Sequence, residues 1–157
     1  MNNLEAIRDL VAARTAKLYP TMQRISFALD GPLGERPASL SYRVVVVTGD
    51  LDGAGCEARV FVSLLGTMAG SGERLIDNAH GNFARGCTDV FALETRDLGA
   101  IRRVRVRHDN TGEHPAWFLV GIWVQCVSSG QEWNFPCGRW LAHDEDDGSI
   151  ERTLSLA

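Results

Sequence analysis

The sequence predicts an all-β fold, an antiparallel β-sandwich with an N-terminal helical arm. After Leu40 the apolar residues occur in short segments rich in Val, Ile and Phe, separated by Gly, Asp and Asn clusters. No helical pattern of ten or more residues separates these segments, which argues against parallel βαβ units. Segments such as RVVVV and LVGIWV have apolar residues at odd and even positions alike, so both faces of the strand are apolar. This is expected in a stack of two sheets whose outer face is partly covered.

The first eighteen residues predict a helix. Asn2 and Glu5 have the spacing of a capping box, and Pro20 ends the segment. The residues at helical spacing are Leu4, Ile7, Leu10, Val11 and Leu18. Two interpretations stay open, a helix that docks on a partner and a helix packed on the chain's own core. Residues 31–39, with two prolines and two glycines, predict a linker, so the chain divides into an arm at 1–38 and a β-sandwich domain at 39–157.

Seven segments are predicted as strands, and the total is expected to be seven or eight. They are residues 41–48, 57–65, 88–94, 101–108, 118–127, 131–136 and 151–156. In the segment IRRVRVRH, alternation places Arg103, Arg105 and Arg107 on one face if Val104 and Val106 face the core. This row is interpreted as a solubilising face, with a phosphate-binding ladder or partner contact as the alternative.

Composition excludes several classes of function. The formal net charge of −4 does not favour nucleic-acid binding. The N-terminus lacks a secretory signal, and the apolar runs are too short for a membrane helix. The four cysteines form no C-x-x-C pair. We therefore expect a soluble, cytoplasmic protein with free, buried thiols.

Motifs for catalysis are absent from the sequence. It contains no G-x-S-x-G, P-loop, H-E-x-x-H or dinucleotide fingerprint. The acidic run at residues 142–149 is typical of solvated surface, because mutual repulsion disfavours a tuned acid–base pair outside a buried site. His108 shares the inward parity of Val106 and is predicted to be buried, before a turn at Asp109 and Asn110. The protein is predicted not to be an enzyme.

Several fragments, in order, resemble the PLAT domain, the β-sandwich of polycystins, lipoxygenases, some lipases and clostridial alpha-toxin. They are YRVVVVTGDLDGAGCEARVFVSLLG, GNFARGCTDVFALETRDLGAIRRVRVRHDNTGEHPAWFL, EWNFPCGRWL and DDGSIER. The ending is most similar to PLAT modules of eukaryotic multidomain proteins. The resemblance implies an eight-stranded sandwich that attaches a protein to membranes or to membrane-associated partners.

The resemblance also implies a calcium site in the loops. Family ligand positions carry over to the side chains of Glu57, Asp77, Asn78 and Asn82 and to the carbonyls of Gly55, Cys56 and His80. Calcium takes six to eight oxygen ligands, and its affinity depends on the number of carboxylates. With two carboxylates we expect weak binding, in the high micromolar to millimolar range at best.

Membrane contact is a further implication of the resemblance. Trp117 matches the position from which lipoxygenases present a tryptophan to the bilayer, and an indole is favoured at the water–lipid boundary. The alternative is a tryptophan folded against the sandwich, which is the expectation for Trp123, Trp133 and Trp140. Leu51 is the second residue expected to enter a bilayer.

Three functions follow from these features. The first is a non-catalytic module that binds protein partners, within a large assembly of a cilium or organelle, or a membrane surface. The second is a calcium-dependent lipid-binding domain. The third is a regulatory subunit or fragment of a lipoxygenase- or lipase-like enzyme.

Overall fold

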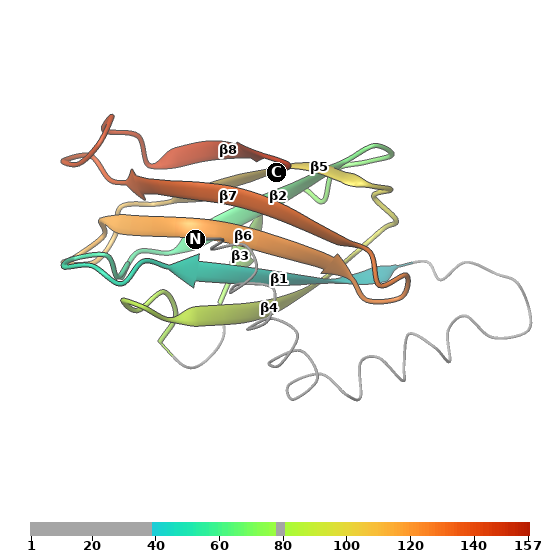
Figure 1. Ribbon diagram of the computed structural model, residues 1–157, viewed down its shortest axis with the longest axis horizontal. Coiled ribbons are helices and arrows are strands. Elements are labelled where there is room, and N and C mark those ends of the chain that lie inside the picture. The colour runs from blue at the N-terminus through green and yellow to red at the C-terminus, as the bar shows by residue number, and fades with distance from the viewer. Residues whose placement is uncertain (1–38, 78–80) are drawn as a thin grey trace, which may run out of the picture.

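The described part of the protein is a sandwich of two antiparallel four-stranded sheets (Figure 1). A computed structural model describes residues 39–77 and 81–157. All eight strands within these residues pair antiparallel, which confirms the all-β prediction. The predicted helical arm, residues 1–38, lies outside the described residues.

The first sheet has the order β4-β1-β6-β7 and the second the order β3-β2-β5-β8. The bounds are β1 Leu40–Thr48, β2 Val60–Gly66, β3 Arg74–Ile76, β4 Thr88–Thr95, β5 Ile101–His108, β6 Trp117–Cys126, β7 Glu132–Leu141 and β8 Glu151–Ser155. The seven predicted segments correspond to seven of these strands. The eighth, β3, was not predicted, because three residues are too short to show alternation.

The core lies between the sheets and follows from alternation along each strand. Val44 and Val46 of β1 point inward from one sheet, and Val104 and Val106 of β5 point inward from the other. All four are completely buried. Removing so many branched side chains from water is the main stabilising contribution to a fold of this size.

Gly66 ends β2 at a register shift and shows how tightly the strands join. A Cβ at this position would lie 2.0 Å from the carbonyl oxygen of Leu98. That atom is backbone and has little freedom to move, so only glycine fits there.

The four cysteines are free thiols. Cys56 and Cys126 are buried, as predicted, but Cys87, in the loop that precedes β4, is exposed, and Cys137 in β7 is half-buried. The described residues form no helix long and apolar enough to cross a membrane.

Candidate functional site

Four connections meet at one end of the sandwich, on the left in Figure 1, and we call them the loop end. In the described residues they are 49–59, 77 with 81–87, 109–116 and 142–150, because β1, β3, β5 and β7 all finish at this end. The loop end has two arginines, Arg59 and Arg85. Its ten acidic residues are Asp50, Asp52, Glu57, Asp77, Asp109, Glu113, Asp144, Glu145, Asp146 and Asp147. It is therefore far more acidic than the chain as a whole, whose net charge is −4.

A cavity of about 470 Å³ lies between three of these loops, and we call it the end groove. Its charged lining includes Asp52, Glu113, Asp144 and Glu145. The half-buried Trp140 also lines it, and its ring packs edge-on against Phe118 with the ring centroids 5.4 Å apart. Carboxylates around an aromatic ring form a site suited to a cation.

The two arginines of the loop end each pair with acids of a neighbouring loop. Arg85 contacts Asp50 at 3.0 Å and Asp52 at 2.7 Å, and all three side chains are largely exposed. Arg59 pairs with Asp109 at 2.8 Å. Such exposed pairs contribute little stability, so we interpret them as orienting the loops.

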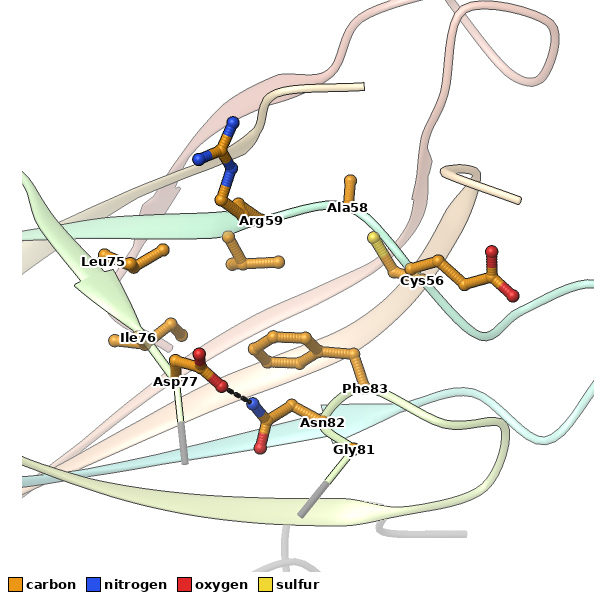
Figure 2. Close-up of a pocket in the computed structure, with 11 residues that line it drawn as sticks. Cys56, Ala58, Arg59, Leu75, Ile76, Asp77, Gly81, Asn82 and Phe83 are labelled. Atoms are coloured by element: carbon orange, nitrogen blue, oxygen red, sulfur yellow. Dashed lines mark hydrogen bonds between the residues drawn. The ribbon is translucent and has the colours of Figure 1, made fainter. Parts of the chain in front are cut away.

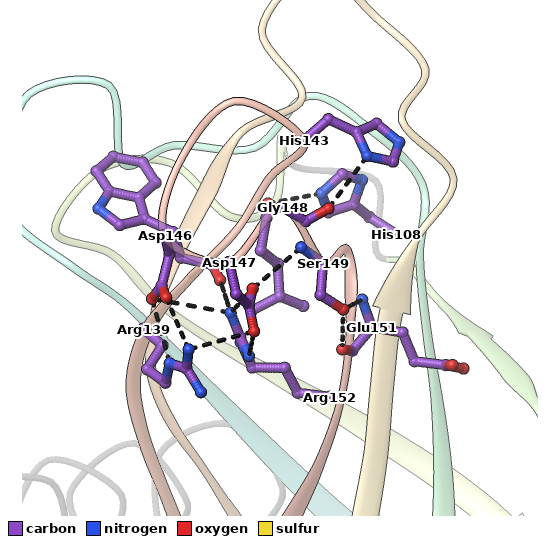
Figure 3. A network of polar contacts seen from close by, with 11 residues as sticks. His108, Arg139, His143, Asp146, Asp147, Gly148, Ser149, Glu151 and Arg152 are labelled. Carbon is purple, nitrogen blue, oxygen red and sulfur yellow. Dashed lines mark hydrogen bonds and ion pairs between the residues drawn. The ribbon is translucent and has the colours of Figure 1, made fainter.

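The loop between β7 and β8 is held by the network in Figure 3, centred on Arg152. The guanidinium of Arg152 donates to the backbone oxygen of Trp140 at 2.6 Å and to Asp147 at 2.8 Å. Arg139 completes the network by bonding Asp146 at 2.7 Å. Hydrogen bonds from Arg152 lower the pKa of Asp147, and those from Arg139 lower the pKa of Asp146. The network therefore fixes Asp146 and Asp147, which directly follow two residues of the end-groove lining, Asp144 and Glu145.

We expect Arg152→Ala to lower the free energy of unfolding by roughly 1.5–3 kcal/mol, because it removes hydrogen bonds made by a charged group whose side chain is 9% exposed. Urea denaturation measures the change. Arg102→Ala, at an exposed position in β5, is the control and should change stability by about 0.5 kcal/mol or less. Equal effects of both substitutions would show that the network does not hold the loop.

Figure 2 shows a second cavity, of about 340 Å³, between the loops that were predicted to hold calcium. The structure brings Cys56 and Glu57 together with Asp77 and Asn82 around it. Gly55 lies next to Cys56, and its position would leave a Cβ 3.0 Å from the backbone nitrogen of Arg85. Asn78 and His80 lie outside the described residues.

The two candidate carboxylates engage different partners in the structure. Asp77 accepts a hydrogen bond from the amide of Asn82 at 2.6 Å, within the cavity (Figure 2). Glu57 accepts one from the backbone N–H of His114 at 3.2 Å, on the neighbouring loop. In the described residues no three His, Cys, Asp or Glu side chains gather as a metal-binding group. The oxygens of Glu57, Asp77 and Asn82 are of the kind that calcium takes, and Glu57 keeps lone pairs free beside its bond to His114.

Trp117 is fully buried, with 0% of its surface exposed, so the prediction that it enters a bilayer is wrong. Its indole N–H donates to Thr48 Oγ1 at 3.0 Å, and its ring packs against Phe83 with the centroids 5.2 Å apart. The alternative, a tryptophan folded against the sandwich, is what the structure shows. Trp123 and Trp133 are buried and Trp140 half-buried. Leu51 is 39% exposed at the loop end.

The arginine row lies on the outer face of the second sheet, along β5. Val104 and Val106 are buried, so the predicted alternation is confirmed. Arg107 is bound to Glu73 at 2.8 Å and lies 4.3 Å from the ring centroid of Phe61. Arg105 is 4.0 Å from Glu151, and Arg103 is exposed. Because Arg105 and Arg107 each lie near an acid of this chain, we interpret the row as a solubilising face rather than a phosphate ladder.

His108 is a buried structural residue, as predicted. Its Nδ1 accepts the N–H of Asn110 at 3.0 Å, so the proton is on Nε2, which donates to the carbonyl of Leu141 at 2.7 Å. Asn110 and Gly112 have positive φ, as the predicted turn requires.

Sequence reasoning missed the end groove. It interpreted the acidic run alone, whereas the groove forms because that run meets the loops at 50–55 and 110–116. The available signal was antiparallel connectivity, which places alternate loops at the same end.

Comparison with known families gives a match over most of the chain. A family model described as the PLAT/LH2 domain matches residues 42–155. Lipoxygenase homology domain-containing protein 1 of Mus musculus is 43% identical over 125 residues, which cover 78% of this chain and 6% of that protein. The polycystin family receptor for egg jelly of Mus musculus is 39% identical over 120 residues, which cover 75% of this chain and 6% of that protein. The chain thus spans a small part of these relatives.

Solved structures show the same fold. Coral 8R-lipoxygenase has a TM-score of 0.66 and 24% identity over 74% of this chain and 17% of that one. The alpha toxin of Clostridium absonum has a TM-score of 0.56 and 15% identity over 78% of this chain and 33% of that one.

Proposed function

The chain belongs to the PLAT/LH2 domain family, and from this premise we propose that it is a non-catalytic module that binds a basic segment of a protein partner in the end groove. The observation that carries the proposal is the acidic lining of the groove beside Trp140. Lys and Arg side chains gain from both features, because carboxylates attract their charge and an indole face attracts cations.

A membrane surface is the weaker partner on the same evidence. Trp117 is buried, which leaves Leu51 as the exposed apolar residue of the predicted pair. Burying one leucine contributes about 1.5–3 kcal/mol, which falls short of even millimolar affinity. The acidic loop end would also be repelled by the anionic lipids of a cytoplasmic leaflet.

Chemistry at the loop end supports a binding role rather than catalysis. Burial raises the pKa of the Cys56 thiol to about 12, so the thiolate that acts as a nucleophile is scarcely populated at neutral pH. His108 is committed to two backbone partners.

The proposal is tested by fluorescence anisotropy with a labelled oligo-arginine peptide as the probe. We expect the peptide to bind, and its affinity to fall as the salt concentration rises. The double variant Asp144→Lys with Glu145→Lys should bind the peptide roughly tenfold more weakly. Each exposed ion pair is worth roughly 0.2–1 kcal/mol, and reversing the charges adds repulsion. Neither side chain forms part of the network around Arg152.

The matched control reverses one charge at a time. Glu94→Lys lies on an exposed position of β4 at the other end of the sandwich and should leave affinity nearly unchanged, whereas Glu145→Lys should reduce it. Equal losses for the two variants would indicate attraction to net charge rather than to the groove, and would refute the proposed site.

A calcium-dependent lipid-binding domain is the second candidate. One observation in its favour is the cavity that Glu57 and Asp77 both line. A second is the likeness to two solved structures. They are coral 8R-lipoxygenase, described with calcium activation through a C2-like domain, and a calcium-dependent 11R-lipoxygenase. In this chain Asp77 and Asn82 would hold the ion from one loop and Glu57 with the carbonyls of Gly55 and Cys56 from the other.

Calorimetry and thermal denaturation with several millimolar calcium test this second candidate. We expect weak binding, in the high micromolar to millimolar range, with a rise in melting temperature. Asp77→Asn should abolish both signals, while Asp52→Asn, outside the cavity, should retain them. No heat and no shift in the unaltered protein would eliminate the calcium site.

Flotation with phosphatidylserine vesicles separates the two candidates. The protein-binding proposal predicts no flotation with or without calcium, because the acidic loop end faces an anionic surface. Flotation only with calcium would instead support the second candidate. As part of the first proposal, we place the protein in the cytoplasm, within a larger assembly at a cilium or organelle.

A further inference from the structure

The first sheet carries an apolar patch on its outer face, opposite the core. Val45 of β1 points away from Val44 and Val46, which belong to the core. The outer patch consists of Val45, Val90 and Trp123, with Val47 and Val120 packed against them. Its members lie side by side, since Val45 pairs with Val90 on one side and with Trp123 on the other.

This patch is buried although it faces outward. The exposed fractions are 1% for Val45, 6% for Val90 and 5% for Trp123. All eight described strands belong to the two sheets, so none of them lies over this face. An outward-facing apolar patch that is buried to this degree needs a segment that covers it.

The chain itself contains a segment suited to this patch. Leu4, Ile7 and Val11 form an apolar stripe at helical spacing, extended by Leu10 and Leu18. The segment is tethered to Leu40, the first residue of β1, which is a central strand of the same sheet. Twenty-one connecting residues, 19–39, reach up to about 70 Å at about 3.3 Å each, so the segment can reach the patch.

We propose that residues 4–18 dock as an amphipathic helix on the outer patch. Tethering makes the contact intramolecular, with an effective concentration in the millimolar range, which favours this segment over a second copy or a separate partner. Of the two open interpretations of the N-terminal helix, the proposal selects packing on the chain's own fold. It is independent of the end groove, which lies at the end of the sandwich rather than on its face.

Nuclear Overhauser effects in the full chain, labelled at Ile, Leu and Val methyls, test the proposal. We expect contacts from the methyls of Ile7 and Val11 to those of Val45 and Val90. Ile7→Glu should abolish these contacts and shift the methyl signals of Val45 and Val90. The methyl signals of the core residues Val62 and Val104 should not move. The melting temperature should fall by several degrees. Ala16→Glu, on the opposite side of the predicted helix, is the control and should change none of these.

Two results would overturn the proposal. One is the absence of these contacts in the unaltered protein, with Val45 and Val90 signals that Ile7→Glu does not move. The other is contacts that arise only between differently labelled copies in a mixed sample, which would assign the patch to a second copy.

Discussion

Trp117→Ala is expected to lower the free energy of unfolding by about 3–5 kcal/mol, the usual cost of removing a large buried aromatic side chain. The indole joins three elements, because it lies at the start of β6, bonds Thr48 at the end of β1 and packs on Phe83 in the loop before β4. Its removal should leave a cavity behind the loop end and the Thr48 hydroxyl without this donor. Urea denaturation, with unfolding followed by circular dichroism, measures the loss.

Trp140→Ala is the control for this substitution. That ring is half-buried and makes an edge contact with Phe118, so its removal should cost markedly less stability than the loss of Trp117. It should weaken binding of the oligo-arginine peptide, because Trp140 lines the end groove. A Trp117→Ala protein as stable as the unaltered one, but defective in vesicle binding, would restore the bilayer interpretation.

His108→Ala is expected to cost about 2–4 kcal/mol, through a buried cavity and two unsatisfied backbone groups. The ring is 0% exposed and connects the turn after β5 to the end of β7, through Asn110 and Leu141. His114→Ala, at an exposed position of the same loop, should be nearly neutral. Thermal denaturation of both variants at pH 7.5 provides the comparison.

His108 also predicts how stability depends on pH. Burial lowers the pKa of His108 below its ordinary value of 6.5, so the unfolded chain takes up a proton before the folded one does. The contribution of neutral His108 to the free energy of unfolding is therefore complete above about pH 6.5. It is lost as the pH falls through the lowered pKa of the folded state. The His108→Ala variant should lose less stability than the unaltered protein over this window. An identical decline in both would assign the effect to other groups.

Strand parity explains how much of the fold was predictable. The inward positions of Val104, Val106 and His108 followed from alternation in one short segment. The apolar residues at both parities of β1 predicted a partly covered outer face, where the structure has the outer patch. Trp117 shares the parity of the buried Leu119, so the sequence contained the signal for its burial, although the resemblance to lipoxygenases suggested otherwise.

The candidate site was less predictable, because it depends on contacts between distant loops. Glu57 faces the β5–β6 loop through its bond to the backbone of His114, fifty-seven residues away, and no local pattern shows this. Arg152 orders the acidic run by bonding the carbonyl of Trp140 on another strand. Spacing identified the calcium candidates but not the direction of each carboxylate.

Chemical-shift mapping of the isotopically labelled protein with the oligo-arginine peptide tests the central proposal most directly. The proposal predicts that the amide and indole signals that move belong to the end groove, above all Glu113, Trp140, Asp144 and Glu145, and that the Asp144→Lys with Glu145→Lys variant loses these shifts. Shifts scattered over both sheets, or concentrated on the arginine row of β5, would contradict binding at the loop end.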